Sequence, residues 1–314
     1  MFKLQRYAQT VAQIPSLGDV VDYLKINQKC TIADIVEATG LSHPTVAHAL
    51  RLAQEADVAI KREIATSSGG RRAQIYALNP DFIHYALMVV KEDGVVYQIR
   101  DFEGKVLSNI QKKCDKNDFI VGLTRIVENI KIEDDLVELC AISLPCVVNG
   151  IMIEEWARLG LRKVNIVEQI ETKTGVKVRI ENDMKLLSLA GCHEDDQEGE
   201  IHVSLYVDKS SVGIGVSIDG KVFKGASGYA GEIKYCPNMG GLVGDKAVRA
   251  ALNAIAMYNP NSMTVFAQDS AKASAYVNAI SKRLPEYLVP RFVIYDDYVV
   301  AQTQALWELV RGTL

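Results

Sequence analysis

The segment TIADIVEATGLSHPTVAHALRLAQ (31–54) constrains the fold more than any other part of the chain. Apolar residues recur at helical spacing on both sides of a short break at Gly40, which predicts two short helices joined by a tight turn. Thr31 and Ser42 are suitable N-cap residues, and Pro44 fits the first turn of the second helix. This pattern is typical of a helix-turn-helix, although some three-helix bundles share it and bind no DNA.

The flanking segments extend this pattern. LGDVVDYLKI (17–26) predicts a preceding helix, while DVAIKREI (57–64) and AQIYAL (73–78) predict two strands of a hairpin. Glycines at the hairpin tip allow close backbone approach, and arginines there can pair with phosphates or enter a minor groove. The expected DNA-contacting residues of the tip are Gly69, Gly70, Arg71 and Arg72. A helix-turn-helix followed by a basic hairpin predicts a winged-helix DNA-binding domain over residues 1–79.

The second helix of the pair would be the recognition helix, whose N-terminal residues enter the major groove. Its polar residues on the side opposite the core are Ser42, His43, Thr45 and His48. Residues 1–80 hold nine Lys and Arg against seven Asp and Glu, so this part carries +2 while the whole chain carries −4. A basic end on an acidic body is a weak indication of a polyanionic partner.

Composition limits the remaining classes. The 314 residues are 48% hydrophobic, which is enough for two domains or more. No apolar run is long enough to span a membrane, and the first residues lack the pattern of an export signal. The six cysteines form no CxxC pair, which favours reduced thiols in the cytoplasm over disulfides or structural zinc. After residue 80, strand-like and helix-like segments alternate, which predicts an α/β body.

Several segments carry a resemblance to a known family. The chain resembles the repressor members of the ROK (repressor, open reading frame, kinase) family in LSHPTVAHAL (41–50), SSGGRRAQIYALNP (67–80), RIENDMKLLSLAG (179–191), VGIGVSIDGKVFKGASGYAGEIKY (212–235) and LNAIAMYNP (252–260). The resemblance implies an N-terminal winged helix-turn-helix followed by an α/β actin-like (ribonuclease H-like) sugar-kinase fold. The expected body is 80–314, with lobes of roughly 80–180 and 181–295 and a C-terminal helix returning to the first lobe.

The resemblance also implies that kinase chemistry has been lost. Asp183 stands where the family kinases keep their catalytic base. Lys91 and Glu92, however, stand where the first phosphate loop needs small residues, and Lys209 and Ser211 replace glycines of the second. A kinase needs that phosphate cradle, because its catalysis is positioning and charge neutralisation. We therefore expect no catalytic residue and no cofactor.

The family's zinc site and sugar site lead to two further expectations. Tyr235 replaces a zinc-ligating histidine, and Cys236 is the single thiol of the former zinc loop, so no metal is expected. Carboxylate and amide groups suit sugar hydroxyls. The effector-binding residues implied by the family alignment are Asn182, Asp183, Glu232 and Tyr235.

The combined interpretation is a cytoplasmic transcriptional regulator, expected to repress carbohydrate-metabolism genes. Its partners would be a double-stranded DNA operator, a sugar or sugar-phosphate effector, and a second copy in a homodimer or homotetramer. Three alternatives stay open from the sequence. One is an active ROK-type sugar kinase with a fused DNA-binding domain, and another is a DNA-bound scaffold without a small effector. The third is a vestigial cleft, in which Asp183 only caps a helix.

Overall fold

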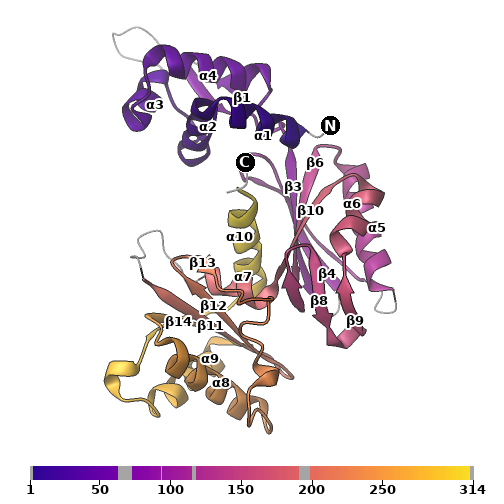
Figure 1. Cartoon of the computed structure of the whole chain (residues 1–314), viewed down its shortest axis with the longest axis vertical. Coiled ribbons are helices and arrows are strands. Elements are labelled where there is room, and N and C mark those ends of the chain that lie inside the picture. The colour runs from indigo at the N-terminus through magenta and orange to yellow at the C-terminus, as the bar shows by residue number, and fades with distance from the viewer. Residues whose placement is uncertain (1–2, 63–72, 93, 115–117, 191–198, 312–314) are drawn as a thin grey trace.

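The computed structural model of the chain describes residues 3–62, 73–92, 94–114, 118–190 and 199–311. Three parts are stacked along the long axis in Figure 1: an N-terminal unit, a first lobe and a second lobe. The hairpin tip with Gly69, Gly70, Arg71 and Arg72 lies outside the described residues. Within the described ranges, no helix combines the length and apolar character that a membrane crossing requires.

The N-terminal unit consists of four helices and one hairpin. Its elements are α1 (Lys3–Gln13), α2 (Pro15–Asn27), α3 (Ile32–Thr39), α4 (His43–Glu55), β1 (Ala59–Arg62) and β2 (Ile75–Leu78), with β1 and β2 antiparallel. Thr31 forms a capping box with Asp34, and the side chain of Ser42 accepts from Thr45 N. Gly40 ends α3 in a left-handed conformation. The three predicted helices and the caps between them are confirmed, while α1 was not expected.

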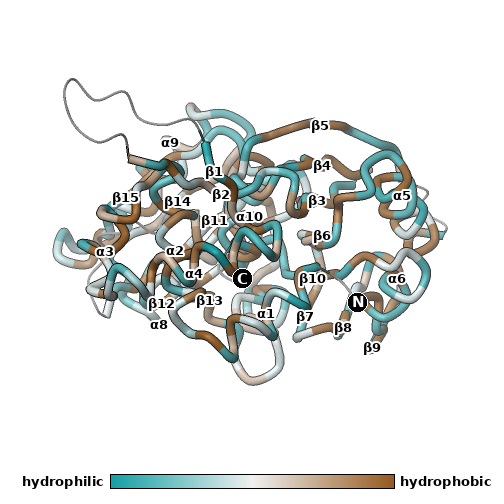
Figure 2. Tube along the Cα trace, turned by 90° about the horizontal axis from the view of Figure 1, so that it is seen from above, coloured by the Kyte–Doolittle hydropathy of each residue, from teal (hydrophilic) through white to brown (hydrophobic). Residues whose placement is uncertain are grey.

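The first lobe is built on a five-stranded mixed sheet of order β10-β6-β3-β4-β5. Its strands are β3 (His84–Lys91), β4 (Gly94–Arg100), β5 (Val106–Lys112), β6 (Val137–Leu144) and β10 (Lys177–Asn182). A smaller sheet beside it contains β7 (Val147–Asn149), β8 (Met152–Trp156) and β9 (Leu161–Val164), with a short helix η1 (Ala157–Leu159). Helices α5 (Phe119–Glu133) and α6 (Ile166–Thr174) cover the outer face of the lobe in Figures 1 and 2.

The second lobe repeats this plan with a sheet of order β13-β12-β11-β14-β15. Its strands are β11 (Ile201–Val207), β12 (Val212–Ile218), β13 (Lys221–Val222), β14 (Ser262–Phe266) and β15 (Arg291–Tyr295). Its helices are α7 (Asp183–Leu189), η2 (Ile233–Tyr235), α8 (Val243–Tyr258), α9 (Ser270–Ser281) and η3 (Glu286–Leu288). Helix α7 lies between the two lobes, whereas α8 and α9 cover the far face of the second sheet (Figure 1). Two sheets covered by helices around a central crevice confirm the expected α/β architecture.

The last helix, α10 (Tyr298–Arg311), connects all three parts of the molecule. It starts beside the second lobe, packs against β3 and β6 of the first lobe, and ends next to α2 of the N-terminal unit (Figures 1 and 2). Asp297 caps its start by accepting from the backbone nitrogens of Val299 and Val300. Trp307 is buried on its apolar side. This side of α10 packs against β3 and β6 of the first lobe.

One hydrophobic cluster joins the N-terminal unit, the first lobe and α10, and we call it the shared core. Aromatic rings meet at its centre, where Tyr7 of α1 lies edge-on to Phe82 and Tyr85 of β3 lies edge-on to Trp307 of α10. The three parts contribute buried side chains that include Leu17, Val20, Leu24, Leu50, Leu78, Leu87, Val89, Leu306 and Val310. Full burial of one such side chain stabilises the fold by about 1.5–3 kcal/mol. The N-terminal unit is therefore part of the body's core.

Polar contacts reinforce the same junction. Glu138 of β6 accepts hydrogen bonds from the backbone nitrogens of Lys3 and Leu4, so the first lobe caps the N-terminus of α1. The guanidinium of Arg62 on β1 pairs with both carboxylate oxygens of Glu103, at 2.9 and 3.0 Å. Both bonds come from the same nitrogen, Arg62 Nη2, and the pair ties β1 to the turn between β4 and β5 of the first lobe. The N-terminal unit thus has one defined orientation relative to the first lobe.

Gly104 provides a test of the shared core, because it turns the chain between β4 and β5 directly against Trp307. Its φ is +91°, and an added Cβ would lie 2.6 Å from Trp307 Cζ2. We expect Gly104→Ala to lower the free energy of unfolding by about 2–3 kcal/mol, through clash and backbone strain together. Gly160→Ala is the matched control, since Gly160 has φ +64° with no atom within 4 Å of such a Cβ, and strain alone should cost about 1 kcal/mol. Urea unfolding measures both, and equal losses would contradict the packing at Trp307.

Candidate functional site

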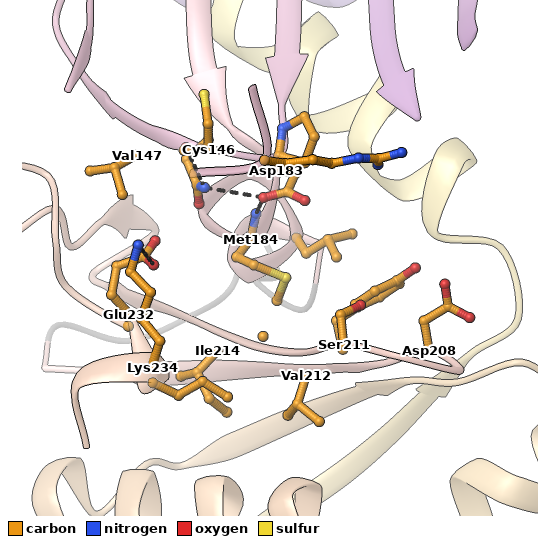
Figure 3. A pocket seen from close by; sticks show the side chains of 18 of the residues that line it. Cys146, Val147, Asp183, Met184, Asp208, Ser211, Val212, Ile214, Glu232 and Lys234 are labelled. Carbon is orange, nitrogen blue, oxygen red and sulfur yellow. Dashed lines mark hydrogen bonds and ion pairs between the residues drawn. The ribbon is translucent and has the colours of Figure 1, made fainter. Parts of the chain in front are cut away.

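A cleft of about 720 Å³ lies between the two lobes. Its walls come from the β3–β4 turn, β8, the start of α7, the β11–β12 turn, the η2 region and α10. Figure 3 shows Asp183 and Met184 in the centre, Glu232 and Lys234 on one side, and Ser211 and Asp208 on the other. A volume in this range suits a small ligand such as a sugar.

The centre of the cleft is the point where β10 ends and α7 begins. Asn182 is the N-cap of α7, and its Oδ1 accepts from Lys185 N at 3.0 Å. Its Nδ2 donates to Cys146 O and to Asp183 Oδ1. The N-cap of α7 is therefore Asn182, and Asp183 supports the same turn by accepting from Met184 N. Asn182 lines the cleft, but its amide is used for structure, so its contact with an effector stays a prediction.

Asp183 presents its carboxylate to the cleft from the first turn of α7. Its Oδ1 accepts from Met184 N at 2.8 Å (Figure 3). Burial raises the pKa of Asp183 to about 7, and the negative charge of Glu232 adds to that rise. A carboxyl group with this pKa can donate or accept a proton near neutral pH, and it can hydrogen-bond to a hydroxyl in either state.

Glu232 and a buried lysine complete the acidic side of the cleft. Burial raises the pKa of Glu232. Lys185 of α7 is only 2% exposed, and its Nζ donates to Gly228 O, so it holds the loop before Glu232 in place. Burial also lowers the pKa of Lys185, whose charge faces Glu181, Glu232 and Asp183. This lysine was not predicted, because nothing in the segment ENDMK shows which face of α7 would be enclosed.

Tyr235 lies at the rim of the cleft and is 63% exposed. Its hydroxyl donates to Glu155 Oε2 at 3.0 Å, and Lys234 Nζ lies 3.0 Å from the same oxygen. These two bonds lower the pKa of Glu155. The structure thus brings Asn182, Asp183 and Glu232 together in the cleft wall and places Tyr235 just outside it. Glu155 and Lys234 were not predicted, since their pairing spans 79 residues.

The other half of the cleft contains the two loops that the family resemblance relates to phosphate binding. In the first loop, Glu92 forms an ion pair with Arg158 at 2.8 Å. In the second, Asp208 lines the cleft beside Ser211. Two carboxylates in this half would repel a triphosphate, although Arg158 offsets the charge of Glu92.

Gly213 and Gly215 on β12 have a packing role. An added Cβ at Gly213 would lie 2.5 Å from Met184 Sδ, and one at Gly215 would lie 2.0 Å from Met184 O. Both glycines therefore allow α7 to lie directly on β12. That contact accounts for glycine at these two positions without a bound phosphate.

The second candidate site is the exposed face of α4. Ser42, His43 and His48 are exposed there, whereas Thr45 is half-buried and its hydroxyl lies 2.7 Å from Ser42 Oγ. The opposite face is buried through Val46, Ala49, Leu50 and Ala53.

Arg51 belongs to the same face and was missed. It is exposed one turn after His48, with its Nη2 2.9 Å from His48 Nδ1. The helical spacing of three residues would have identified it from the sequence. Gly69, Gly70, Arg71 and Arg72 lie outside the described residues, so their contribution stays a prediction.

In the part of the chain that the structure describes, no three His, Cys, Asp or Glu residues are grouped as metal ligands would be. The loop after η2, where the family resemblance would place zinc, is instead held from α8. Arg249 of α8 donates to Gly240 O in that loop. A side-chain contact therefore anchors this segment.

Comparison with known proteins gives matches over most of the chain. Residues 93–237 match the ROK family. The xylose repressor of Staphylococcus xylosus is 24% identical over 184 residues, which is 54% of this chain. The matched region covers 46% of that repressor, so this chain aligns with about half the length of its curated relative.

Solved structures of low sequence identity share the fold over 74–90% of the chain. A ROK family transcriptional regulator, described as a homologue of the E. coli MLC protein, matches with a TM-score of 0.64 at 16% identity. The match covers 90% of this chain and 94% of that regulator. Lmo2764 of Listeria monocytogenes, a protein named as an N-acetylmannosamine kinase, matches with a TM-score of 0.61 at 14% identity, over 74% of this chain and all of its own. These likenesses show the fold of ROK family proteins.

The raised pKa of Asp183 predicts a pH-dependent stability cost. The pKa of Asp183 is about 7 in the folded protein, against an ordinary value of 3.8, so the folded state binds the proton more tightly than the unfolded state. The resulting stabilisation is complete below pH 3.8 and is lost as pH rises through 7. Asp183→Asn should unfold with about the same free energy as the wild type near pH 4 and be more stable above pH 7, by up to about 4 kcal/mol. Urea unfolding across this range tests it. A variant that is equally stable or less stable at pH 8 would contradict the environment described for this carboxyl group.

Proposed function

Because the chain carries a ROK family domain over residues 93–237, we propose that it is a DNA-binding transcriptional repressor. In this proposal, residues 1–79 form a winged-helix domain and residues 80–314 form a degenerate sugar-kinase body that binds an effector. The regulator would act in the cytoplasm as a two-fold dimer on two operator half-sites, separated by about one helical turn or a multiple of it.

The observation that carries the proposal is the two-sided character of α4. One face is fully buried, and the other presents Ser42, His43, His48 and Arg51 to solvent at the start of the helix and along it. The tight Gly40 turn sets α3 against α4 as a helix-turn-helix requires. Hydroxyl and guanidinium groups are among the side-chain groups that read base edges in the major groove.

The charges of the cleft favour an uncharged sugar as the effector over a sugar phosphate. Its lining holds five carboxylates against three cations, and two of those cations, Arg158 and Lys234, are already paired with Glu92 and Glu155. A phosphate would add further negative charge beside Asp183 or Asp208. Sugar hydroxyls, in contrast, can donate to these carboxylates without adding charge.

Helix α10 offers a route from the cleft to the DNA-binding surface. Tyr298 and Gln302 near its start line the cleft, and Gln302 Oε1 accepts from Ser143 of the first lobe at 2.8 Å. Trp307 and Val310 near its end belong to the shared core with the N-terminal unit. A ligand that shifts α10 would therefore change the placement of α4. This coupling is allosteric only if the ligand binds the two arrangements with different affinity.

A sugar kinase is the second candidate, because ROK kinases such as the glucokinase of Streptomyces griseus share the fold, with a TM-score of 0.55 at 13% identity over 73% of this chain and 99% of that enzyme. Asp183 stands where the family kinases keep their catalytic base, which supports this candidate. The carboxylates of Glu92 and Asp208 in the phosphate half argue against it. The repressor proposal predicts no sugar-dependent ATP consumption by the full chain, and steady consumption would favour the kinase.

The salt dependence of DNA binding tests the wing. A duplex selected from a random pool by the full chain is titrated at several NaCl concentrations by fluorescence anisotropy. We expect Arg71→Ala/Arg72→Ala to weaken binding and to reduce the slope of log K against log salt by about 2, since each lost phosphate contact removes about 0.9. Lys282→Ala/Arg283→Ala removes two adjacent exposed cations of the second lobe and should leave the slope unchanged. An unaltered slope in the wing variant would contradict the assignment.

A melting assay tests the effector class. D-xylose is included because a xylose repressor is among the relatives, and D-glucose is compared with glucose 6-phosphate. We expect an uncharged sugar to raise Tm by several degrees at saturation, its phosphate to have no effect, and Glu232→Gln to abolish the shift. Glu154→Gln is the matched control, because Glu154 neighbours the cleft on β8 but does not line it. A shift that survives Glu232→Gln would place the ligand elsewhere.

A further inference from the structure

Three side chains meet across the rim of the cleft, and they come from different lobes. Glu155 lies on β8, whose neighbouring residues Ile153 and Trp156 belong to the hydrophobic core of the first lobe. Lys234 and Tyr235 lie on η2, which Ile233 anchors in the core of the second lobe. Any contact between these groups therefore ties one lobe to the other.

The contact is specific in its geometry. Lys234 Nζ and the hydroxyl of Tyr235 both lie 3.0 Å from Glu155 Oε2. The ammonium group is also 4.0 Å from Glu232 Oε2 and 5.0 Å from the centre of the Tyr235 ring. Lys234 is thus placed between a carboxylate of the first lobe and one of the second. Its aromatic neighbour limits the directions in which it can move.

This contact is at the open end of the cleft. Earlier in the same loop, Lys224, itself 42% exposed, pairs with Glu181, whose side chain is 4% exposed. Glu155 and Lys234 are 20% and 41% exposed. In Figure 3, Lys234 and Glu232 lie on the side of the cleft away from Asp208. Separation of Glu155 from Lys234 would therefore open the rim while the pair of Lys224 with the buried Glu181 stays in place.

We propose that Glu155, Lys234 and Tyr235 form an interlobe latch, which controls the passage of small uncharged molecules into the cleft. The proposal concerns the regulation of the site described above, so it rests on the proposed function where it identifies those molecules with an effector. The latch itself does not depend on whether those molecules include an effector. A partly exposed ion pair is weak and is screened by salt, so the latch breaks and re-forms at ordinary temperature.

Trp156 reports on the latch because it neighbours Glu155 and lines the cleft while only 5% exposed. The chain has two tryptophans, so Trp307→Phe leaves Trp156 as the single fluorophore. Acrylamide is the probe, since it is small and uncharged and must enter the cleft to quench Trp156. We expect Lys234→Met to raise the quenching constant by about two- to fivefold, the range for loss of one partly exposed ion pair. Tyr235→Phe should give a smaller increase.

Glu92→Gln is the matched control, because Glu92 and Arg158 form a cleft ion pair within the first lobe alone. This variant should be quenched like the parent protein. Raising NaCl should increase quenching in the parent and have little effect on Lys234→Met. If Trp307→Phe does not fold, the comparison is made with both tryptophans, where Trp307 adds a constant background.

Quenching that is unchanged in Lys234→Met, or raised equally by Glu92→Gln, would overturn the latch. The measurement uses neither DNA nor sugar, so this failure would leave the repressor proposal untouched. Conversely, an increase in Lys234→Met together with no sugar binding would support the latch and count against the proposed effector.

Discussion

The structure depends on one constraint, which is that the DNA-binding candidate shares a hydrophobic core with the first lobe and with α10, the helix whose start lines the cleft. If an exposed, flexible linker joined the N-terminal unit to the body, the unit would move independently. Ligand binding in the cleft could then not change its position. Instead Tyr7, Phe82, Tyr85 and Trp307 interlock at the junction, and Glu138 caps α1 from the first lobe. Close-packed interiors transmit displacement because they have few voids to absorb it. The orientation of α4 is therefore tied to the position of α10.

Under the proposed function, the groups of the cleft have lost one chemistry and kept another. Phosphoryl transfer requires excess positive charge and close backbone approach, whereas sugar binding requires hydrogen-bond acceptors in a partly enclosed space. Glu92 and Asp208 work against the first requirement. Asp183 and Glu232 meet the second at a cost in stability, since burial raises the pKa of both. Buried groups whose shifted pKa values lower the stability of the fold are commonly found at functional sites.

The sequence predicted the elements better than their contacts. Helix caps at Thr31 and Ser42 follow from local chemistry, so the helix-turn-helix was readable, and alternating segments indicated the α/β body. Family resemblance located Asp183 and Glu232 in one cleft. Neither source could find Glu155 beside Lys234, or Lys185 beneath Glu232, because those contacts depend on how distant segments fold together. Asn182 is instructive as well, since its amide caps α7 and supports Asp183 instead of facing solvent.

Native-state hydrogen exchange tests the shared core most directly, because it reports the opening free energy of each segment in the full chain. The account predicts that the slowest amides of α2 and α4 exchange with the same free energy as those of β3 and β6, since all four elements open in one cooperative unit. If α2 and α4 instead exchange through a separate opening of much lower free energy, the N-terminal unit is an independent module. The cleft would then have no rigid connection to the surface proposed to bind DNA.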